Sequence, residues 1–159
     1  MRILFALFLV SLFSCTARQP TGAVLSPSTK QERVADYQAV YTAINDYVEA
    51  IYAVKPELIA RSVDTELKKI GYYFNEEKES YRDNLPMTYD QLYSLAGKWN
   101  SEGDMANEDS PREIEVFEVN DKTAVGKLTA TWGIDYFQLA KVGGSWKIKH
   151  IIWQSAPRN

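Results

Sequence analysis

Four segments with the pattern of β-strands follow one another in the last third of the chain, and their succession constrains the fold most. They span residues 113–119, 123–132, 134–142 and 145–153. The pairs Asn120-Asp121 and Gly143-Gly144 separate neighbouring segments, and both suit the tight turns of β-hairpins. This part of the sequence therefore predicts an antiparallel meander.

A long helical pattern opens the folded part of the chain. Thr29 and Glu32 match the capping box T-x-x-E, which stabilises the N-terminus of a helix. Apolar residues then recur every three or four positions, so we expect one long helix that ends near Val54 and carries a single apolar stripe. The stripe consists of Val34, Tyr37, Tyr41, Ile44, Val48 and Ile51.

Two shorter helices and a strand lie between these regions. A helix starting at Pro56 is expected to fade near Val63, because proline is tolerated at the first helical position. Residues 68–74 alternate as a strand, and residues 75–88 fit either a hairpin or a loop. Thr88 and Gln91 form a second capping box before a third helix. Helices followed by a meander are typical of an α+β domain, with the helices packed on one face of an antiparallel sheet.

The first fifteen residues have the features of a secretory signal. Arg2 lies beside the N-terminus, an apolar run follows, and the small Ser14 precedes Cys15. A cysteine at the end of such a run resembles the signal of a bacterial lipoprotein, with Leu12-Phe13-Ser14-Cys15 as the lipobox. Phe13 departs from the usual pattern, in which a small residue is more common. The alternative is an ordinary signal that is cleaved without lipidation.

This interpretation divides the chain into three parts. We expect residues 1–14 to be a lipoprotein signal peptide, residues 15–29 a flexible tether and residues 30–157 the folded domain. The mature protein would be anchored in the cell envelope by lipid at Cys15. In a Gram-negative cell, Thr16 at the next position favours the outer membrane.

Charge and cysteine content exclude several classes of function. The net charge of −3 becomes −4 without the signal peptide, which argues against a nucleic-acid partner. Cys15 is the one cysteine, so a lipidated chain has no disulfide, no thiol nucleophile and no cysteine-based zinc site. We found no phosphate-binding, dinucleotide-binding, calcium-binding or metalloprotease motif, and we expect no cofactor and no metal.

Two segments carry a family resemblance. Residues 41–72 and residues 134–157 resemble the nuclear transport factor 2-like (NTF2-like) superfamily, and within it the lumazine-binding branch. The second segment is the more specific, with an Asp-Tyr pair, a Gly-rich turn and a closing Trp. The resemblance covers residues 31–157 and implies three helices on a curved antiparallel sheet, a cone-shaped pocket between them, and frequent dimers. Members often carry a histidine where this chain has Ser62-Val63-Asp64, and the resemblance implies no particular activity.

Asp135 and His150 are the two residues that suggest chemistry. Enzymes of this fold, such as the ketosteroid isomerase and polyketide cyclase branches, place carboxylates in the cone, where Asp135 would abstract a proton. The simpler interpretation is that Asp135 caps a turn or pairs with a lysine on the surface. Strand alternation puts His150 on one face with Trp146, Ile148 and Ile152. A lone histidine there is either a pocket acid–base group or a structural residue, and we favour the structural role.

The sequence therefore leaves three functions open. The first is a small-ligand-binding or accessory protein without catalytic residues, for a small apolar or aromatic ligand. The second is a cofactor-free isomerase, dehydratase or cyclase that uses Asp135 and His150. The third is a structural envelope protein with a closed cone. We expect a homodimer, and the candidate ligand contacts are Tyr41, Tyr73, Trp99, Trp132, Asp135 and His150.

Overall fold

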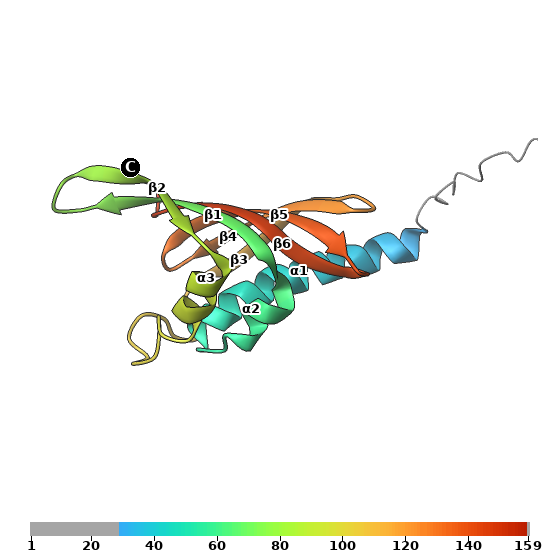
Figure 1. Ribbon diagram of the computed structural model, residues 1–159, viewed down its shortest axis with the longest axis horizontal. Coiled ribbons are helices and arrows are strands. Elements are labelled where there is room, and N and C mark those ends of the chain that lie inside the picture. Colours follow the sequence, from blue (N-terminus) through green and yellow to red (C-terminus); the bar gives the residue numbers. More distant parts are fainter. Residues whose placement is uncertain (1–28, 159) are drawn as a thin grey trace, which may run out of the picture.

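The computed structural model describes residues 29–158, which fold as three helices on one face of a six-stranded sheet (Figure 1). The helices are α1 (Lys30–Tyr52), α2 (Glu57–Ser62) and α3 (Tyr89–Ala96). Both predicted capping boxes are confirmed. The Thr29 side chain accepts from the backbone N–H of Glu32 at 3.2 Å, and the Thr88 side chain accepts from that of Gln91 at 3.3 Å. The predicted signal peptide, Cys15 and nearly all of the tether lie outside the described residues.

The sheet has the strand order β2-β1-β6-β5-β4-β3. Its strands are β1 (Val63–Asn75), β2 (Ser80–Met87), β3 (Arg112–Val119), β4 (Thr123–Ala130), β5 (Gly133–Val142) and β6 (Ser145–Gln154). The last four form the predicted meander, and residues 75–88 form a hairpin rather than a loop. One pair, β1 with β6, is parallel, so the sheet is mixed. The predicted α+β fold of helices packed on a curved sheet is confirmed.

The apolar stripe of α1 is buried only in the second half of the helix. Ile44, Val48 and Ile51 are buried, but Val34 is 63% and Tyr41 is 38% exposed. Figure 1 shows the reason, because the N-terminal end of α1 extends past the ends of the strands. The expected stripe therefore belongs to the buried core from Ile44 onward, and Tyr41, which was expected to face the sheet, is partly exposed.

A β-bulge in β6 changes which side chains face the helices. Gln138 pairs with His150 and Leu139 pairs with Ile148, so Lys149 is an extra residue without a partner in the register. Trp146 and Ile148 are buried before the bulge. His150 and Ile152, which follow the bulge, are exposed. The predicted shared face of His150 with Trp146 and Ile148 is wrong, because alternation shifts by one residue at the bulge.

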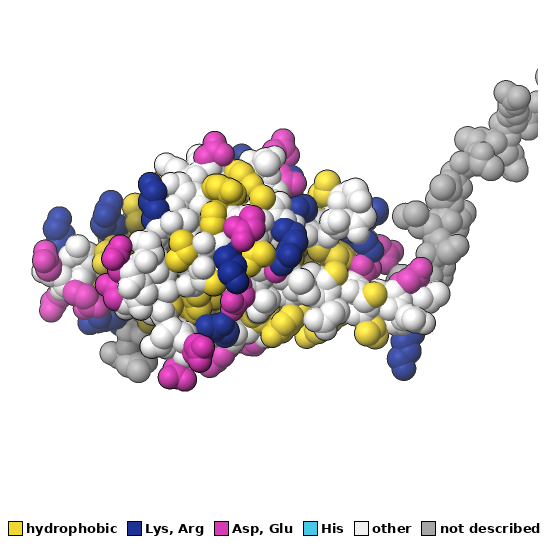
Figure 2. All heavy atoms as spheres, turned by 90° about the horizontal axis from the view of Figure 1, so that it is seen from below, with side chains coloured by type: hydrophobic (Ala, Val, Ile, Leu, Met, Phe, Trp, Pro, Cys, Tyr) yellow, Lys and Arg dark blue, Asp and Glu magenta, His cyan; other side chains and the backbone are white. Residues whose placement is uncertain are grey.

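Within residues 29–158, we find no helix whose length and apolarity would allow it to cross a membrane. On the side of the helices, acidic and basic side chains are interspersed with apolar ones (Figure 2).

Candidate ligand-binding site

A cavity of about 140 Å³ lies between the helices and the sheet. α1, β1, α3 and β6 all contribute to its wall, together with the end of β2 and the segments that follow α3 and β4. The lining residues are Tyr47, Ile51, Lys69, Met87, Leu95, Trp99, Trp132 and Trp153. Three of the four tryptophans of the chain therefore surround one small space with flat, largely apolar surfaces.

A buried ion pair adjoins this cavity. Lys69 is 5% exposed and Asp135 is fully buried, and their Nζ and Oδ1 atoms lie 2.9 Å apart. Lys69 Nζ also donates to the Tyr47 hydroxyl at 2.5 Å. That hydroxyl donates to Asp135 Oδ1 at 3.3 Å, and Trp132 Nε1 donates to Asp135 Oδ2 at 2.5 Å. Three donors from α1, β1 and the β4–β5 turn thus converge on one carboxylate.

The environment of this cluster keeps Tyr47 protonated. Burial raises the pKa of the Tyr47 phenol well above its ordinary value, and the neighbouring Asp135 raises that pKa further. Tyr47 therefore acts as a neutral donor. Both oxygens of Asp135 already accept hydrogen bonds, one of them from a cation. A carboxylate held in this way is a structural counter-ion rather than a free general base.

Local sequence explains why Trp153 can reach the cavity. Gly71 lies opposite Trp153 in the parallel β1–β6 pair. A Cβ atom on Gly71 would lie 2.1 Å from Trp153 Nε1, which is far too close. Glycine at this position therefore provides the space that the indole ring occupies.

Aromatic contacts hold the other two tryptophans. Trp99 stacks on Tyr52 with ring centroids 6.0 Å apart, and Trp132 meets both rings edge-on at 5.4 and 5.5 Å. Such aromatic pairs contribute about 0.5–1.5 kcal/mol each beyond area burial. Tyr52 therefore determines the position of two cavity walls, although it does not line the cavity itself.

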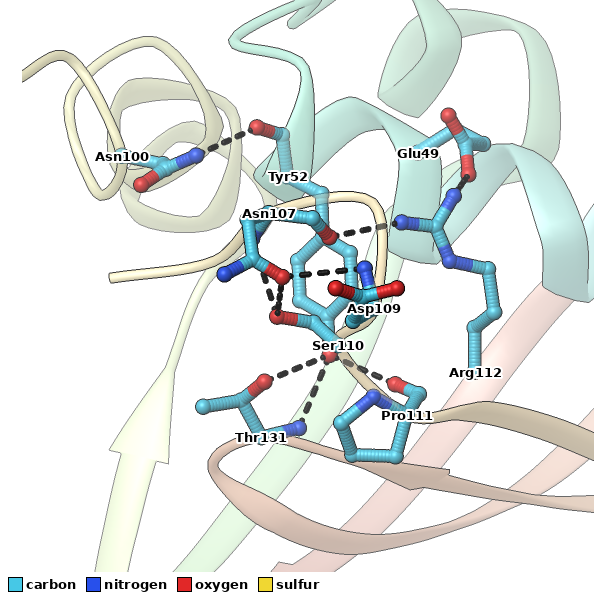
Figure 3. Close-up of polar contacts among 9 residues, drawn as sticks. All are labelled: Glu49, Tyr52, Asn100, Asn107, Asp109, Ser110, Pro111, Arg112 and Thr131. Atoms are coloured by element: carbon cyan, nitrogen blue, oxygen red, sulfur yellow. Dashed lines mark hydrogen bonds and ion pairs between the residues drawn. The ribbon is translucent and has the colours of Figure 1, made fainter. Parts of the chain in front are cut away.

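Hydrogen bonds hold Tyr52 in place at the C-terminal end of α1 (Figure 3). Its hydroxyl donates to the carbonyl of Pro111 at 2.7 Å and accepts from the backbone N–H of Thr131 at 2.8 Å. Its carbonyl accepts from the side-chain amide of Asn100 at 2.8 Å. Arg112 pairs with Glu49 and lies 5.1 Å from the centre of the Tyr52 ring. The polar segment between α3 and β3 is thus joined to α1 beside the cavity.

The structure brings together three of the six predicted ligand contacts. Trp99 and Trp132 line the cavity, and Asp135 is hydrogen-bonded to its wall. Tyr41 lies on the exposed side of α1 and does not line this cavity. Tyr73, which is 44% exposed, lies near the C-terminal end of β1 and does not line it either. His150 lies on the opposite face of the sheet, where its Nδ1 is 2.9 Å from Gln138 Oε1.

Sequence reasoning missed Tyr47 and Lys69. Tyr47 follows Ile44 by three positions, so the helical spacing of the stripe was a usable signal. Lys69 carried no such signal, because lysine is rarely buried and its partner Asp135 is 66 residues away. Ile70 also lies on the outer face of the sheet, whereas Leu67, Lys69 and Gly71 face the helices.

The opposite face of the sheet has a shallow apolar hollow of about 410 Å³. Its most exposed apolar side chains are Ile152 at 58%, Phe117 at 54% and Tyr136 at 49%. Exposed apolar surface of this kind is typical of interaction sites. His150 and Gln138 form the polar contact within it.

Comparison with solved structures identifies the class of fold. An NTF2-like protein of unknown function from Silicibacter pomeroyi DSS-3 has 16% identity and a TM-score of 0.55, over 80% of this chain and 99% of that one. One from Shewanella baltica OS155 has 14% identity and a TM-score of 0.57, over 82% and 99%. A "Putative Scytalone Dehydratase" from Novosphingobium aromaticivorans DSM 12444 has 15% identity and a TM-score of 0.53, over 81% of this chain and 89% of that one. At these identities the similarity shows the fold alone, which is NTF2-like.

A sequence family within this fold also matches the chain. Residues 35–154 match the family described as "Putative lumazine-binding", and the chain belongs to it. No curated protein sequence matches the chain. Among residues 29–158, no group of three or more His, Cys, Asp and Glu side chains is arranged to hold a metal ion.

Proposed function

We propose that this protein is a lipid-anchored envelope protein whose cone binds a small ligand. The observation that carries the proposal is the cavity of about 140 Å³ walled by Trp99, Trp132 and Trp153, with Lys69 as its charged group. Small-molecule sites are usually concave, mostly apolar and supplied with a few convergent polar groups, and this cavity has all three properties. The family description is consistent with small-ligand binding.

The enzymatic alternative has weaker support. It relies on Asp135 and His150, but Asp135 is held by three donors and His150 lies on the other face of the sheet. The acid and the base of a catalytic pair must both contact the same substrate molecule. Two side chains on opposite faces of the sheet do not allow this. A closed structural cone is also less favoured, because the interior retains a cavity large enough for a small molecule.

The membrane part of the proposal is supported by the N-terminal sequence. Residues 1–15 combine a positive start, an apolar run and a terminal cysteine. Acylation of Cys15 would place the domain at a membrane surface through residues 15–29. Intact mass of the protein extracted from membranes of its source should match a chain that starts at Cys15 with attached acyl groups. An unmodified Cys15, or cleavage elsewhere, would exclude the anchor.

The proposed function also includes the formation of a homodimer. It is supported by the exposed side chains Phe117, Tyr136 and Ile152, which lie on the sheet face without helices. Burying such a face against a second copy would remove apolar surface from water.

Retention of ligand tests the binding function. Native mass spectrometry of the protein purified from its source should detect a bound small molecule. Trp99→Ala and Trp132→Ala should each lower its retention by about tenfold, because each removes part of the cavity wall. His150→Gln is the matched control, since His150 lies outside the cavity, and it should retain the ligand. Each variant must first be shown to be folded. Equal retention by all three variants would place the ligand elsewhere.

A further inference from the structure

We propose that Lys69 selects the ligand, and that the ligand is a neutral, single-ring molecule with a carbonyl oxygen. This inference rests on the proposed binding function and adds the chemical class of the ligand. It is argued from the hydrogen bonds of Lys69, the charge of the cluster and the size of the cavity.

Lys69 retains one donor for a ligand. A lysine ammonium group has three N–H donors. One N–H of Lys69 is directed to the Tyr47 hydroxyl at 2.5 Å and one to Asp135 Oδ1 at 2.9 Å. The third has no acceptor among residues 29–158, and the side chain lines the cavity. The neighbouring Trp153 ring is a weaker acceptor than an oxygen, so an acceptor oxygen in the cavity would be favourable.

Asp135 and Tyr47 orient this donor. Asp135 is fixed from its other side by Trp132 Nε1 at 2.5 Å, and the Lys69 ammonium group lies 5.2 Å from the ring centre of Tyr47. The ammonium group also lies 5.5 Å from the centre of the Trp153 ring. A cation held among these groups keeps its position when the cavity is empty, so little ordering is needed on binding.

The charge of the cluster favours a neutral ligand. Lys69 is already neutralised by Asp135, and both side chains are almost completely buried. A carboxylate ligand would leave this enclosed cluster with a net negative charge, and a cationic ligand would leave it with a net positive one. Burying an uncompensated charge is strongly unfavourable. A carbonyl oxygen accepts the third N–H without adding charge.

The size of the cavity favours one ring. Its volume of about 140 Å³ is close to that of an engineered cavity of about 150 Å³ that holds benzene, and pockets for drug-sized ligands are about 300–1,000 Å³. A two-ring compound such as lumazine is larger than benzene and would require the cavity to widen. A single ring fits between the tryptophans without that change.

Cyclohexanone and methylenecyclohexane test the inference as a matched pair. The two molecules have the same ring, and only the first has a carbonyl oxygen. Binding to the full-length protein can be followed by calorimetry and by the fluorescence of the tryptophans that line the cavity. The variant Lys69→Met/Asp135→Asn removes both charges together, so no unpaired charge is left to prevent folding. The preference for cyclohexanone over methylenecyclohexane should fall by about tenfold in this variant. Lumazine should bind more weakly than cyclohexanone.

The outcomes separate the inference from the function on which it rests. If both ring compounds bind, but the preference for cyclohexanone is the same in wild type and double variant, the cavity binds small rings and Lys69 does not select among them. Tighter binding of lumazine would refute the size argument. If no compound binds and Trp99→Ala also leaves retention of the native ligand unchanged, the binding function itself is wrong.

Discussion

Lys69 and Asp135 show which parts of the site a sequence can predict. Asp135 was identified as a candidate because it belongs to a recognisable tail segment. Its simpler interpretation placed a lysine pair on the surface, whereas the structure buries the pair with Lys69. The lysine itself was not predictable, because Lys69 on β1 reaches Asp135 on β5 across β6, and β1 and β6 are distant in sequence. Trp99 and Trp132 line the cavity as expected, but the same reasoning also selected Tyr41 and Tyr73, which do not line it. Local patterns thus indicated the apolar wall, and only the strand pairing revealed the cation.

The first prediction concerns the buried pair. Lys69→Met should lower the free energy of unfolding by about 3–5 kcal/mol, because it leaves the fully buried Asp135 without its cation. Lys68→Met is the matched control on the exposed side of the same strand, and it should change stability by about 0.5 kcal/mol or less. Urea unfolding at neutral pH measures both variants. A similar small loss in both variants would mean that the pair contributes nothing.

Single elements were predicted well where local signals define them. The capping boxes at Thr29 and Thr88 mark the helix starts, and the turn pairs mark the hairpins of the meander. The bulge at Lys149 has no such signal, because an extra residue in one strand depends on how its neighbour pairs. The side of the sheet that His150 faces was therefore predicted wrongly, although its strand was correct. The exposed first turns of α1 depend similarly on the length of the sheet beneath them.

A pair of substitutions in α1 tests where the helix is packed. Ile44 is fully buried and Val34 is 63% exposed, although both belong to the same predicted stripe. Ile44→Ala should lower the free energy of unfolding by about 2–5 kcal/mol, because it leaves a cavity between helix and sheet. Val34→Ala should change it by about 0.5 kcal/mol or less. Chemical denaturation measures both, and a large effect of Val34→Ala would mean that a partner covers this end of α1.

The N-terminal half of α1 depends on an electrostatic contact with the sheet. Lys141 Nζ donates to Asp36 at 2.5 Å and Trp146 Nε1 donates at 2.9 Å. The hydrogen bond from Lys141 is the main reason why the pKa of Asp36 lies below its ordinary value of 3.8. A folded-state pKa that is lower than the unfolded one stabilises the protein above about pH 4, and this stabilisation is lost as pH falls through the folded-state pKa.

Asp36→Asn should therefore lower the free energy of unfolding by about 1 kcal/mol at pH 7. The difference between wild type and variant should begin to shrink below pH 3.8, the ordinary pKa of an aspartate, where the unfolded chain takes up the proton first. It should vanish once the pH has fallen through the lower folded-state pKa of Asp36. Asp83→Asn, at an exposed position of β2, is the control and should have no such pH-dependent effect. Thermal unfolding from pH 2.5 to pH 7 measures the profiles. A difference that stays constant over this range would exclude the carboxylate as its cause.

At the scale of the molecule, one sheet carries apolar side chains on both faces. Phe137 and Leu139 of β5 face the helices and are buried, whereas Tyr136 on the same strand is 49% exposed. The helices cover one face of the sheet and leave the other face open (Figure 1), and the cavity lies between the helices and the covered face. Exposure of Phe117 and Ile152 on that face would be unfavourable unless a second surface covers them. The two faces therefore suggest two roles, ligand binding inside the cone and association outside it.

The last prediction tests this association. If the open face joins two copies, Phe117→Lys and Ile152→Lys should each shift the chain from dimer to monomer, because a charge would have to be buried in an apolar interface. Val34→Lys is the control, since Val34 is equally exposed but lies on α1 rather than on the sheet. Sedimentation velocity of the chain from Thr16 onward, prepared without lipid, measures the mass. A monomeric wild-type chain, or equal dissociation by Val34→Lys, would exclude the sheet face as the interface. Tryptophan fluorescence of Phe117→Lys should remain that of the wild type, because the cavity lies on the other side of the sheet.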